Sequence, residues 1–496
     1  MMLAARGGEI MGWWLEFLPR KEVVGATKEI GVKEKAGREK TPDVVICGAG
    51  IAGISAAYHL SVRHGVRNVI LVDERPPLTL TSDKSTECYR NFWPGPGDAM
   101  VSLMNRSIDI LEELARETGN AFHLSRRGYL YCCADLEQVP NLRRAAEESA
   151  ALGAGPLRCH DGKPSHESYI PPDDRDFDKQ PTGIDLITEK SLIERHFPYL
   201  SEKVLAVLHA RRCGWFSVQQ LGMLLLEKAR QRGVRLLSGK IRSVDIVGNR
   251  IQAVRIERNG ALERIPTKHF VLAAGPLLKE VGRTIGLEFP VFSELHLKIA
   301  FKDSHRIVPR RAPMLIGTDP IVLPWSEEER KEWASSEGTR KLLGPLPSGV
   351  HTRPEGGLES IVLLGLWPYD VVPVEPVFPF PIDPHYPEMV LRGLATIVPG
   401  LQRYVEHLPQ AVVDGGYYTK TRENRPLIGK LPVEGAYVIG ALSGFGVMAA
   451  CGAGDLLASH VTAGPLPHYA SAFAFERYED PHYQQLLKEW EQSGQL

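Results

Sequence analysis

The sequence has little of several features that would assign it to a specialised class of protein. Its formal net charge is −1 and its basic residues are scattered, so the charge pattern predicts no binding to nucleic acid or to an anionic membrane. No hydrophobic run approaches the roughly 20 residues that a transmembrane helix needs. What remains is an ordinary globular composition, with 43% hydrophobic and 24% charged residues.

Cysteine is also sparse. The 496 residues include seven cysteines and no CxxC motif, and only Cys132 and Cys133 are adjacent. This pattern predicts neither a disulfide framework nor a zinc site, so we expect no metal ion. Because free thiols persist in a reducing compartment, a cytoplasmic location is the simplest expectation.

The first 40 residues differ in character from the rest of the chain. Trp13 and Trp14 lie in a short apolar segment, and a Lys/Glu-rich stretch follows at 32–40. The apolar segment is too short for a secretory signal. We therefore predict an N-terminal extension over residues 1–40, and two roles stay open for it. It is either a passive tail or an anchor that binds an interface or a partner.

The most informative stretch is 41–75. An apolar run over 43–47 predicts a short buried strand, and the glycine-rich segment 48–53 follows it directly and opens a helix rich in Ala, Ile and Leu. A second apolar run at 69–72 ends on Asp73. Strand, turn, helix, strand and acidic residue thus follow one another at the spacing of a dinucleotide-binding unit.

Each glycine of this unit has a physical role. Gly48 permits the tight turn, Gly50 lets the backbone approach a pyrophosphate, and Gly53 lets the helix lie close to the strand. Asp73 is placed to accept hydrogen bonds from a ribose hydroxyl. The motif alone does not separate FAD from NAD. The cofactor-binding residues predicted here are Gly48, Gly50, Ile51, Ala52, Gly53, Asp73 and Glu74.

The remaining chain is long enough for two packed domains. Residues 152–185 are rich in Pro, Gly and Asp and predict a long surface loop, whereas 218–232 predict a helix. The run over 269–274 predicts a strand, and Gly275 after it suits a backbone that passes close to a bound cofactor. Residues 290–303 predict another strand.

A second glycine-rich helix start lies near the C-terminus. A strand over 435–440 leads into a helix built on very small residues. Glycines at a helix start let a planar ring approach the free amides, and the helix dipole stabilises negative charge on that ring. A reduced flavin carries such charge. The residues predicted to bind it are Gly444, Phe445, Gly446, Val447 and Met448.

With these glycine-rich segments at both ends, the chain resembles the D-amino-acid oxidase and sarcosine oxidase (DAO) family of flavoproteins from about residue 41 to 480. The resemblance implies an α/β fold: a Rossmann-like FAD-binding domain with an inserted α+β substrate domain built on a large mixed or antiparallel sheet. The predicted organisation is an N-terminal extension (1–40), a discontinuous FAD-binding domain (41–95, 200–289 and 411–480), a substrate domain (96–199 and 290–410) and a C-terminal tail (481–496).

The resemblance also implies a carboxylate clamp. Residues 418–421 match the YTKT-type segment of the monomeric sarcosine oxidases, in which the Lys binds the substrate carboxylate, and this makes Lys420 the first candidate. Arg90 falls where those enzymes carry a carboxylate-binding Arg. His296 and Lys298 alternate on the predicted strand 290–303 and would face the same side, so both are candidates for the pocket wall.

The implied reaction oxidises the C–N bond of an amino acid or N-alkyl amino acid by hydride transfer to flavin N5, giving an imine. No Cys lies in 353–358 and no His lies between Asp73 and Met100, so the positions that relatives use to attach flavin are missing and we expect non-covalent FAD. Residues 282–286 lack the Lys that oxidases often hold above the flavin. The electron acceptor therefore stays open between O2 and a quinone or protein.

Two other functions remain in view. A 2-hydroxy-acid dehydrogenase would use the same clamp and would need a base, for which His296 is the candidate. A flavoprotein that assists assembly of a respiratory complex, with little turnover, would give the N-terminal extension a purpose.

Overall fold

The computed structural model describes residues 43–163, 168–173 and 177–489. The chain divides into two units, 1–40 and 41–496, and the fold concerns the second. The predicted N-terminal extension lies outside the described residues.

A six-stranded sheet forms around the glycine-rich unit. Its order is β20-β21-β13-β1-β2-β9, and every neighbouring pair is parallel except β20 with β21. Because both of its faces are covered, the strands are continuously apolar rather than alternating. The bounds are β1 (Val44–Cys47), β2 (Val69–Asp73), β9 (Arg235–Ser238), β13 (His269–Leu272), β20 (Leu427–Lys430) and β21 (Ala436–Gly440).

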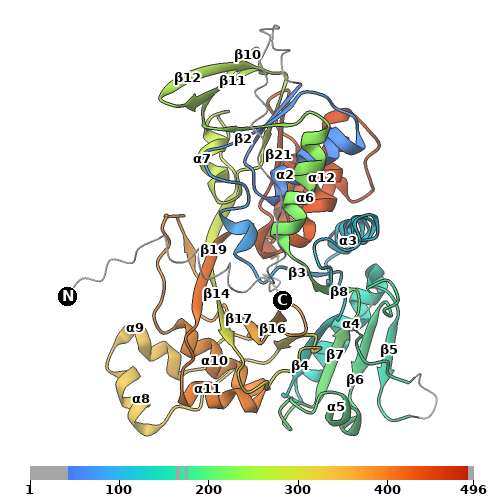
Figure 1. Cartoon of the computed structure of the whole chain (residues 1–496), viewed down its shortest axis with the longest axis vertical. Helices are drawn as coiled ribbons and strands as arrows, with labels where there is room; N and C mark the ends of the chain where they lie inside the picture. Colours follow the sequence, from blue (N-terminus) through green and yellow to red (C-terminus); the bar gives the residue numbers. More distant parts are fainter. Residues whose placement is uncertain (1–42, 164–167, 174–176, 490–496) are drawn as a thin grey trace, which may run out of the picture. The chain divides into compact units, whose positions relative to one another are not determined.

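Helices pack on one face of this sheet, and a smaller group of strands packs on the other. Ile46 and Leu71 pack with the helices, whereas Val45 and Ile70 pack with Ile251 and its neighbours on the opposite side. Figure 1 shows α2 and α12 side by side, with α6 next to them. The helices are α2 (Ile51–Tyr58), α3 (Ala99–Thr118), α6 (Val218–Gln231) and α12 (Gly446–Thr462); the strands opposite are β10 (Lys240–Val247), β11 (Arg250–Arg258) and β12 (Ala261–Pro266).

A ten-stranded mixed sheet forms the second layer system. The order is β18-β14-β17-β16-β15-β4-β7-β6-β5, with β19 paired to β14. The bounds are β4 (Tyr129–Cys133), β5 (Leu157–His160), β6 (Ile184–Ile187), β7 (Ala206–Ala210), β14 (Val291–Lys302), β15 (Met314–Gly317), β16 (His351–Glu355), β17 (Val362–Leu366), β18 (Pro373–Val374) and β19 (Val412–Thr421).

One face of the large sheet packs on helices. Leu130, Leu315 and Leu363 point to this side and contact the cluster that contains Met389 and Leu394 of α10.

The other elements are β3 (Cys88–Arg90), which pairs with β8 (Cys213–Trp215), and α4 (Val139–Ser149), α5 (Lys190–His196), α7 (Leu278–Arg283), α8 (Glu327–Ala334), α9 (Glu337–Arg340), α10 (Tyr386–Ile397), α11 (Gln402–Glu406) and α13 (Pro481–Glu489). The structure confirms the predicted fold class: a Rossmann-like α/β part and a large mixed sheet.

The predicted boundaries differ from the strand pairing in several places. β7 and β19 fall in the segments 200–289 and 411–480, which were predicted to belong to the FAD-binding domain, yet both pair within the large sheet. α3 falls in 96–199, yet it packs on α12. The predicted loop 152–185 contains β5, whose side chains are mostly half-buried and so give only a weak hydrophobic pattern. Local composition does not show which of the two sheets a strand joins, because the strand with which it pairs lies far away in the sequence.

Candidate active site

The strand–turn–helix segment after β1 leaves no room for a side chain at Gly48 or Gly53. Gly48 has φ +112°, and a Cβ on it would lie 2.3 Å from the carbonyl oxygen of Ala273. A Cβ on Gly53 would lie 1.9 Å from the carbonyl oxygen of Gly48. The two glycines therefore let β1, α2 and the end of β13 approach closely at one point.

Asp73, at the end of β2, is held by the backbone. Its Oδ2 accepts a hydrogen bond of 2.8 Å from the Ala49 amide, and its Oδ1 accepts one of 2.9 Å from the Arg75 amide. Each carboxylate oxygen keeps a second lone pair for a ligand. Glu74 instead accepts a hydrogen bond of 2.9 Å from Nη1 of Arg75 and does not line the cavity beside Asp73.

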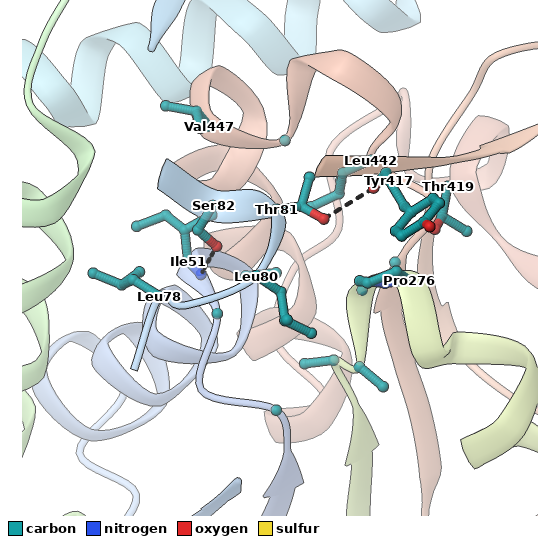
Figure 2. Close-up of a pocket in the computed structure, with 18 of the residues that line it drawn as sticks. Ile51, Leu78, Leu80, Thr81, Ser82, Pro276, Tyr417, Thr419, Leu442 and Val447 are labelled. Atoms are coloured by element: carbon teal, nitrogen blue, oxygen red, sulfur yellow. Dashed lines mark hydrogen bonds between the residues drawn. The ribbon is translucent and has the colours of Figure 1, made fainter. Parts of the chain in front are cut away.

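The first cavity encloses about 870 Å³, counting its open mouth, and is built from segments far apart in the sequence. Figure 2 shows Ser82 Oγ accepting a hydrogen bond from the Ile51 amide and Thr81 Oγ1 donating one to the Tyr417 carbonyl. Of the residues predicted to bind the cofactor, those that line the cavity are Gly48, Gly50, Ile51, Ala52, Asp73, Gly275, Gly444, Gly446 and Val447; Gly53, Glu74, Phe445 and Met448 do not.

A second cavity of about 560 Å³ adjoins the first and shares Ser85, Tyr418 and Gly444 with it. Its wall is the face of the large sheet that points away from α10, since neighbouring strands contribute one residue each. These residues are His296 (β14), Leu366 (β17), His351 (β16), Met314 (β15) and Tyr129 (β4); Phe445 and Met448 line it from the start of α12, and Arg90 and Cys88 from β3.

Arg90 brings a permanent positive charge to this cavity. The side chain is buried, and its Nη1 donates a hydrogen bond of 3.2 Å to Tyr131 Oη. The guanidinium carbon lies 4.8 Å from the ring centroid of Trp93, a distance typical of a cation–π contact. Because the tyrosine and the indole fix the guanidinium, it is oriented before any ligand enters.

His296 and Lys420 meet at a third residue. Nε2 of His296 donates a hydrogen bond of 3.1 Å to Oε2 of Glu294, and Nζ of Lys420 donates one of 3.1 Å to the same oxygen. The His296 ring stacks on Tyr418 with centroids 4.1 Å apart. Lys420 lines neither cavity, so the structure places Arg90 and His296 at the second cavity and Lys420 behind His296.

The charges of this trio are set by burial and pairing. Burial lowers the pKa of His296, although Glu294 opposes the effect, so the imidazole is neutral near pH 7. Burial opposes ionisation of Glu294, but the hydrogen bonds from His296 and Lys420 hold the pKa of Glu294 below its usual value. The trio therefore presents a neutral ring to the cavity, backed by a compensated ion pair.

Comparison with known proteins identifies the family. Residues 43–460 match the family model of the FAD dependent oxidoreductases, DAO. The chain belongs to this family. It is 22% identical to the sarcosine oxidase subunit beta of Rhodobacter capsulatus over 446 residues, which cover 90% of each chain. It is 25% identical to the mitochondrial dimethylglycine dehydrogenase of Rattus norvegicus over 55% of this chain, and the match spans only 29% of that relative's length.

Solved structures agree at the level of the fold. The L-proline dehydrogenase of P. horikoshii superposes with a TM-score of 0.67 at 18% identity, covering 88% of this chain and 98% of the other. This DAO-family protein is thus an FAD-dependent oxidoreductase. None of its described helices combines the length and the apolar character that a membrane span requires.

The first cavity suits FAD. The amino-terminal ends of α2 and α12 both border it, and each supplies backbone amides for negative charge. Gly50 lets the backbone approach a pyrophosphate, and the Asp73 carboxylate suits a ribose. Gly444 and Gly446 lie at the end that adjoins the second cavity, where the flavin ring would reach a substrate.

Two buried cations fix the segment between the cavities: Lys298, which was predicted as a candidate for the pocket wall, and Arg353, which the sequence did not single out. Nζ of Lys298 donates hydrogen bonds to the carbonyls of Asp83 (3.0 Å) and Ser85 (2.8 Å). Nε of Arg353 donates one of 2.6 Å to the carbonyl of Thr86. Lys298 faces the same side as His296, as predicted, but it holds backbone. No local motif announces this role, because the two cations reach the segment from separate strands of the large sheet.

His351 was also missed by the sequence analysis. The ring is buried, and Nδ1 donates a hydrogen bond of 2.9 Å to the carbonyl of Gly349. Burial lowers the pKa of His351 to about 4, with the positive charge of Arg90 among the further causes. The sequence around 350 has no clear hydrophobic pattern that would have pointed to His351, and the residue gains meaning only once β16 is placed beside β15 and β17.

Proposed function

We propose that this protein oxidises the C–N bond of a small amino acid or N-alkyl amino acid. The observation that carries the proposal is Arg90, a fixed and buried cation in a cavity that adjoins the FAD site. A guanidinium pairs well with a carboxylate because its N–H groups match the two carboxylate oxygens. Bound FAD supplies the acceptor for the hydride that leaves the substrate carbon, and the product is an imine.

The chain's own contribution is to bind and orient the substrate. Arg90 binds the carboxylate, and the apolar side chains of Met314, Leu366 and Phe445 exclude water around the carbon that reacts. Holding that carbon over the flavin is an orientation effect, which by itself accounts for a large part of many enzymatic rate enhancements. We give Lys420 a supporting role in place of the predicted direct contact, since its Nζ is committed to Glu294.

The names of the relatives support this substrate class. The sarcosine oxidase subunit and the dimethylglycine dehydrogenase are named for N-methylated amino acids, and the structural neighbour from P. horikoshii is named for proline. All three named substrates carry a carboxylate next to a C–N bond. The electron acceptor, O2 or a quinone or protein, and a cytoplasmic location stay predictions.

A 2-hydroxy-acid dehydrogenase is the second candidate, and the Glu294–His296 pair favours it. An imidazole oriented by a carboxylate is a common general base, and oxidation of an alcohol requires loss of its hydroxyl proton. The assembly-factor alternative depends on residues outside those that the structure describes.

The test is anaerobic bleaching of the flavin in the purified holoprotein. The panel contains sarcosine and other N-methyl amino acids, D- and L-amino acids, proline and 2-hydroxy acids. N-methylethylamine, in which a methyl group replaces the carboxylate of sarcosine, is the matched control. We expect bleaching by an amino acid and none by the control. Bleaching by hydroxy acids alone would move the reaction to C–O oxidation, and no bleaching at all would contradict both candidates.

A further inference from the structure

We propose that Nε2 of His351 accepts a hydrogen bond from the substrate nitrogen, so that the cavity selects carboxylates whose neighbouring nitrogen still carries a hydrogen. Primary amino acids, N-monoalkyl amino acids and cyclic secondary amino acids fit this requirement, whereas the neutral forms of N,N-dialkyl amino acids lack the hydrogen. The inference rests on the proposed function, because it assigns a substrate class to the same site.

The hydrogen bond to Gly349 fixes the tautomer of His351. A backbone carbonyl only accepts, so Nδ1 must carry the proton in this 2.9 Å contact. In a neutral imidazole the other nitrogen then has a free lone pair and no proton. With its pKa lowered to about 4, the ring stays neutral at ordinary pH. His351 therefore offers the cavity an acceptor and no donor at Nε2.

The register of the large sheet places this acceptor opposite the cation. Ile316 on β15 pairs with His351 on one side and with Tyr131 on the other, so His351 and Tyr131 stand at the same level, two strands apart. Neighbouring strands lie about 4.8 Å apart, which separates the two backbones by about 10 Å. Arg90 is anchored to the hydroxyl of Tyr131. Guanidinium and imidazole thus border one small cavity.

This spacing suits an amino acid. In such a substrate the nitrogen and the carboxylate are bonded to the same carbon. A carboxylate bound to Arg90 therefore holds the substrate nitrogen within a few ångströms of the guanidinium. The buried lone pair of His351 would lose its solvation with no return if the group opposite carried no hydrogen.

His296 is the rival acceptor, since its Nε2 donates to Glu294 and its Nδ1 keeps a lone pair. It lies on β14, on the far side of β17 from β16, with its ring against Tyr418. Arg90 is anchored at the β4 end of the same row, beyond β15. The order of the strands therefore favours His351 as the partner of the substrate nitrogen.

Two ring carboxylates that cannot be oxidised test the inference without turnover. Pyrrole-2-carboxylate presents an N–H where furan-2-carboxylate presents an oxygen, and the two are otherwise alike in size and charge. Binding of each to the holoprotein is measured by titration of the flavin absorbance. We expect the pyrrole acid to bind about ten-fold more tightly, the size of one hydrogen bond plus the avoided repulsion between two acceptors.

Variants identify the residue that is responsible. His351→Leu removes the acceptor and should bring the ratio of the two dissociation constants close to one. His351→Gln keeps an acceptor but adds amide N–H groups that can donate to the furan oxygen, so its ratio should lie between those of the wild type and His351→Leu. His296→Leu should leave the ratio near ten-fold. If His351→Leu fails to retain flavin, the wild-type ratio and the His351→Gln variant still provide the test.

The outcomes separate this inference from the proposed function. Equal binding of the two acids to the wild-type protein overturns the role of His351 and leaves the carboxylate site intact. If the preference disappears in His296→Leu and persists in His351→Leu, the substrate nitrogen binds His296, and the role proposed for His351 is wrong. Binding of neither acid contradicts a carboxylate site, and the inference fails with it.

Discussion

Arg90 is the residue on which substrate binding depends most. We expect Arg90→Gln to raise the KM for an amino acid by ten- to a hundred-fold, because a hydrogen bond to a charged group contributes about 1.5–3 kcal/mol. The flavin content should not change, since Arg90 lines only the second cavity. Steady-state kinetics and the ratio of flavin to protein absorbance provide the measurement.

Arg116→Gln is a matched control for that substitution. Arg116 is 52% exposed and pairs with Asp178 on the surface of α3, so its loss should leave the KM unchanged. An unchanged KM in Arg90→Gln would contradict the proposal that Arg90 binds the substrate carboxylate.

His351 also makes the stability depend on pH. Its pKa is about 4 in the folded protein and about 6.5 in the unfolded chain, so its contribution is complete above pH 6.5. It is lost as the pH falls from 6.5 to about 4, because the unfolded state binds the proton first. The difference corresponds to about 3 kcal/mol.

The thermal midpoint of the wild-type protein should therefore fall between pH 7 and 4.5. His351→Asn does not titrate in this range, so its midpoint should fall by less. Equal falls for the two proteins would show that the ring is not held neutral. Other buried histidines contribute to both curves in the same way and cancel in this comparison.

At this scale the sequence predicted only what a motif or a resemblance could indicate. Arg90 was predicted from the resemblance and His296 from the alternation along its strand, and both line the second cavity. Lys420 was predicted to touch the substrate, but its partner Glu294 lies 126 positions away on β14. His351 and Lys298 acquire their roles from side chains and carbonyls brought together by the sheet, which a linear pattern does not contain.

Among the elements, the strand–turn–helix unit at β1 and α2 tolerates the least change. A Cβ on Gly53 would lie 1.9 Å from a backbone oxygen, so Gly53→Ala must push α2 away from the turn. We expect a loss of stability of about 1–3 kcal/mol, as for overpacking in a core, together with weaker retention of FAD.

The control for Gly53→Ala is Gly357→Ala. A Cβ on Gly357 meets no atom within 4 Å, and Gly357 is not in the left-handed region. Thermal midpoints and flavin content of the two variants, measured side by side, test the difference. A fully flavinated Gly53→Ala protein of normal stability would contradict the close-packing role of this glycine.

The elements with strong local signals were predicted correctly. The helix predicted over 218–232 is α6 (Val218–Gln231), and the apolar runs at 69–72 and 269–274 contain most of β2 and all of β13. β5 was missed because three of its four residues are only partly buried, and its partner β6 begins at the far end of the predicted loop. At β7 and β19 the predicted domain boundaries differ from the strand pairing, because pairing, and not composition, decides which sheet a strand joins.

At the scale of the whole molecule, residues 41–496 form a unit of their own. The predicted extension over residues 1–40 is outside the described residues, and its role as a tail or an anchor can be tested by removing it. We expect the chain that starts at Thr41 to keep its flavin content, its thermal midpoint and its turnover. Loss of membrane or partner association with normal turnover would support the anchor, and loss of flavin would contradict the independence of the second unit.

FAD itself should hold this unit together, since its cavity is lined by segments from Gly48 to Val447. A ligand that binds only the folded state stabilises it by about 2.7 kcal/mol at a hundred times its dissociation constant, and by about 1.4 kcal/mol more for each further ten-fold. The thermal midpoint of the apoprotein should therefore rise steadily with added FAD. FMN should raise it less, because it lacks the AMP half that the Gly48 turn and Asp73 are predicted to bind. Denaturation should release all of the flavin, since we expect no covalent link. Flavin that stays with the denatured chain, or a midpoint that ignores added FAD, would contradict a non-covalent site that joins these segments.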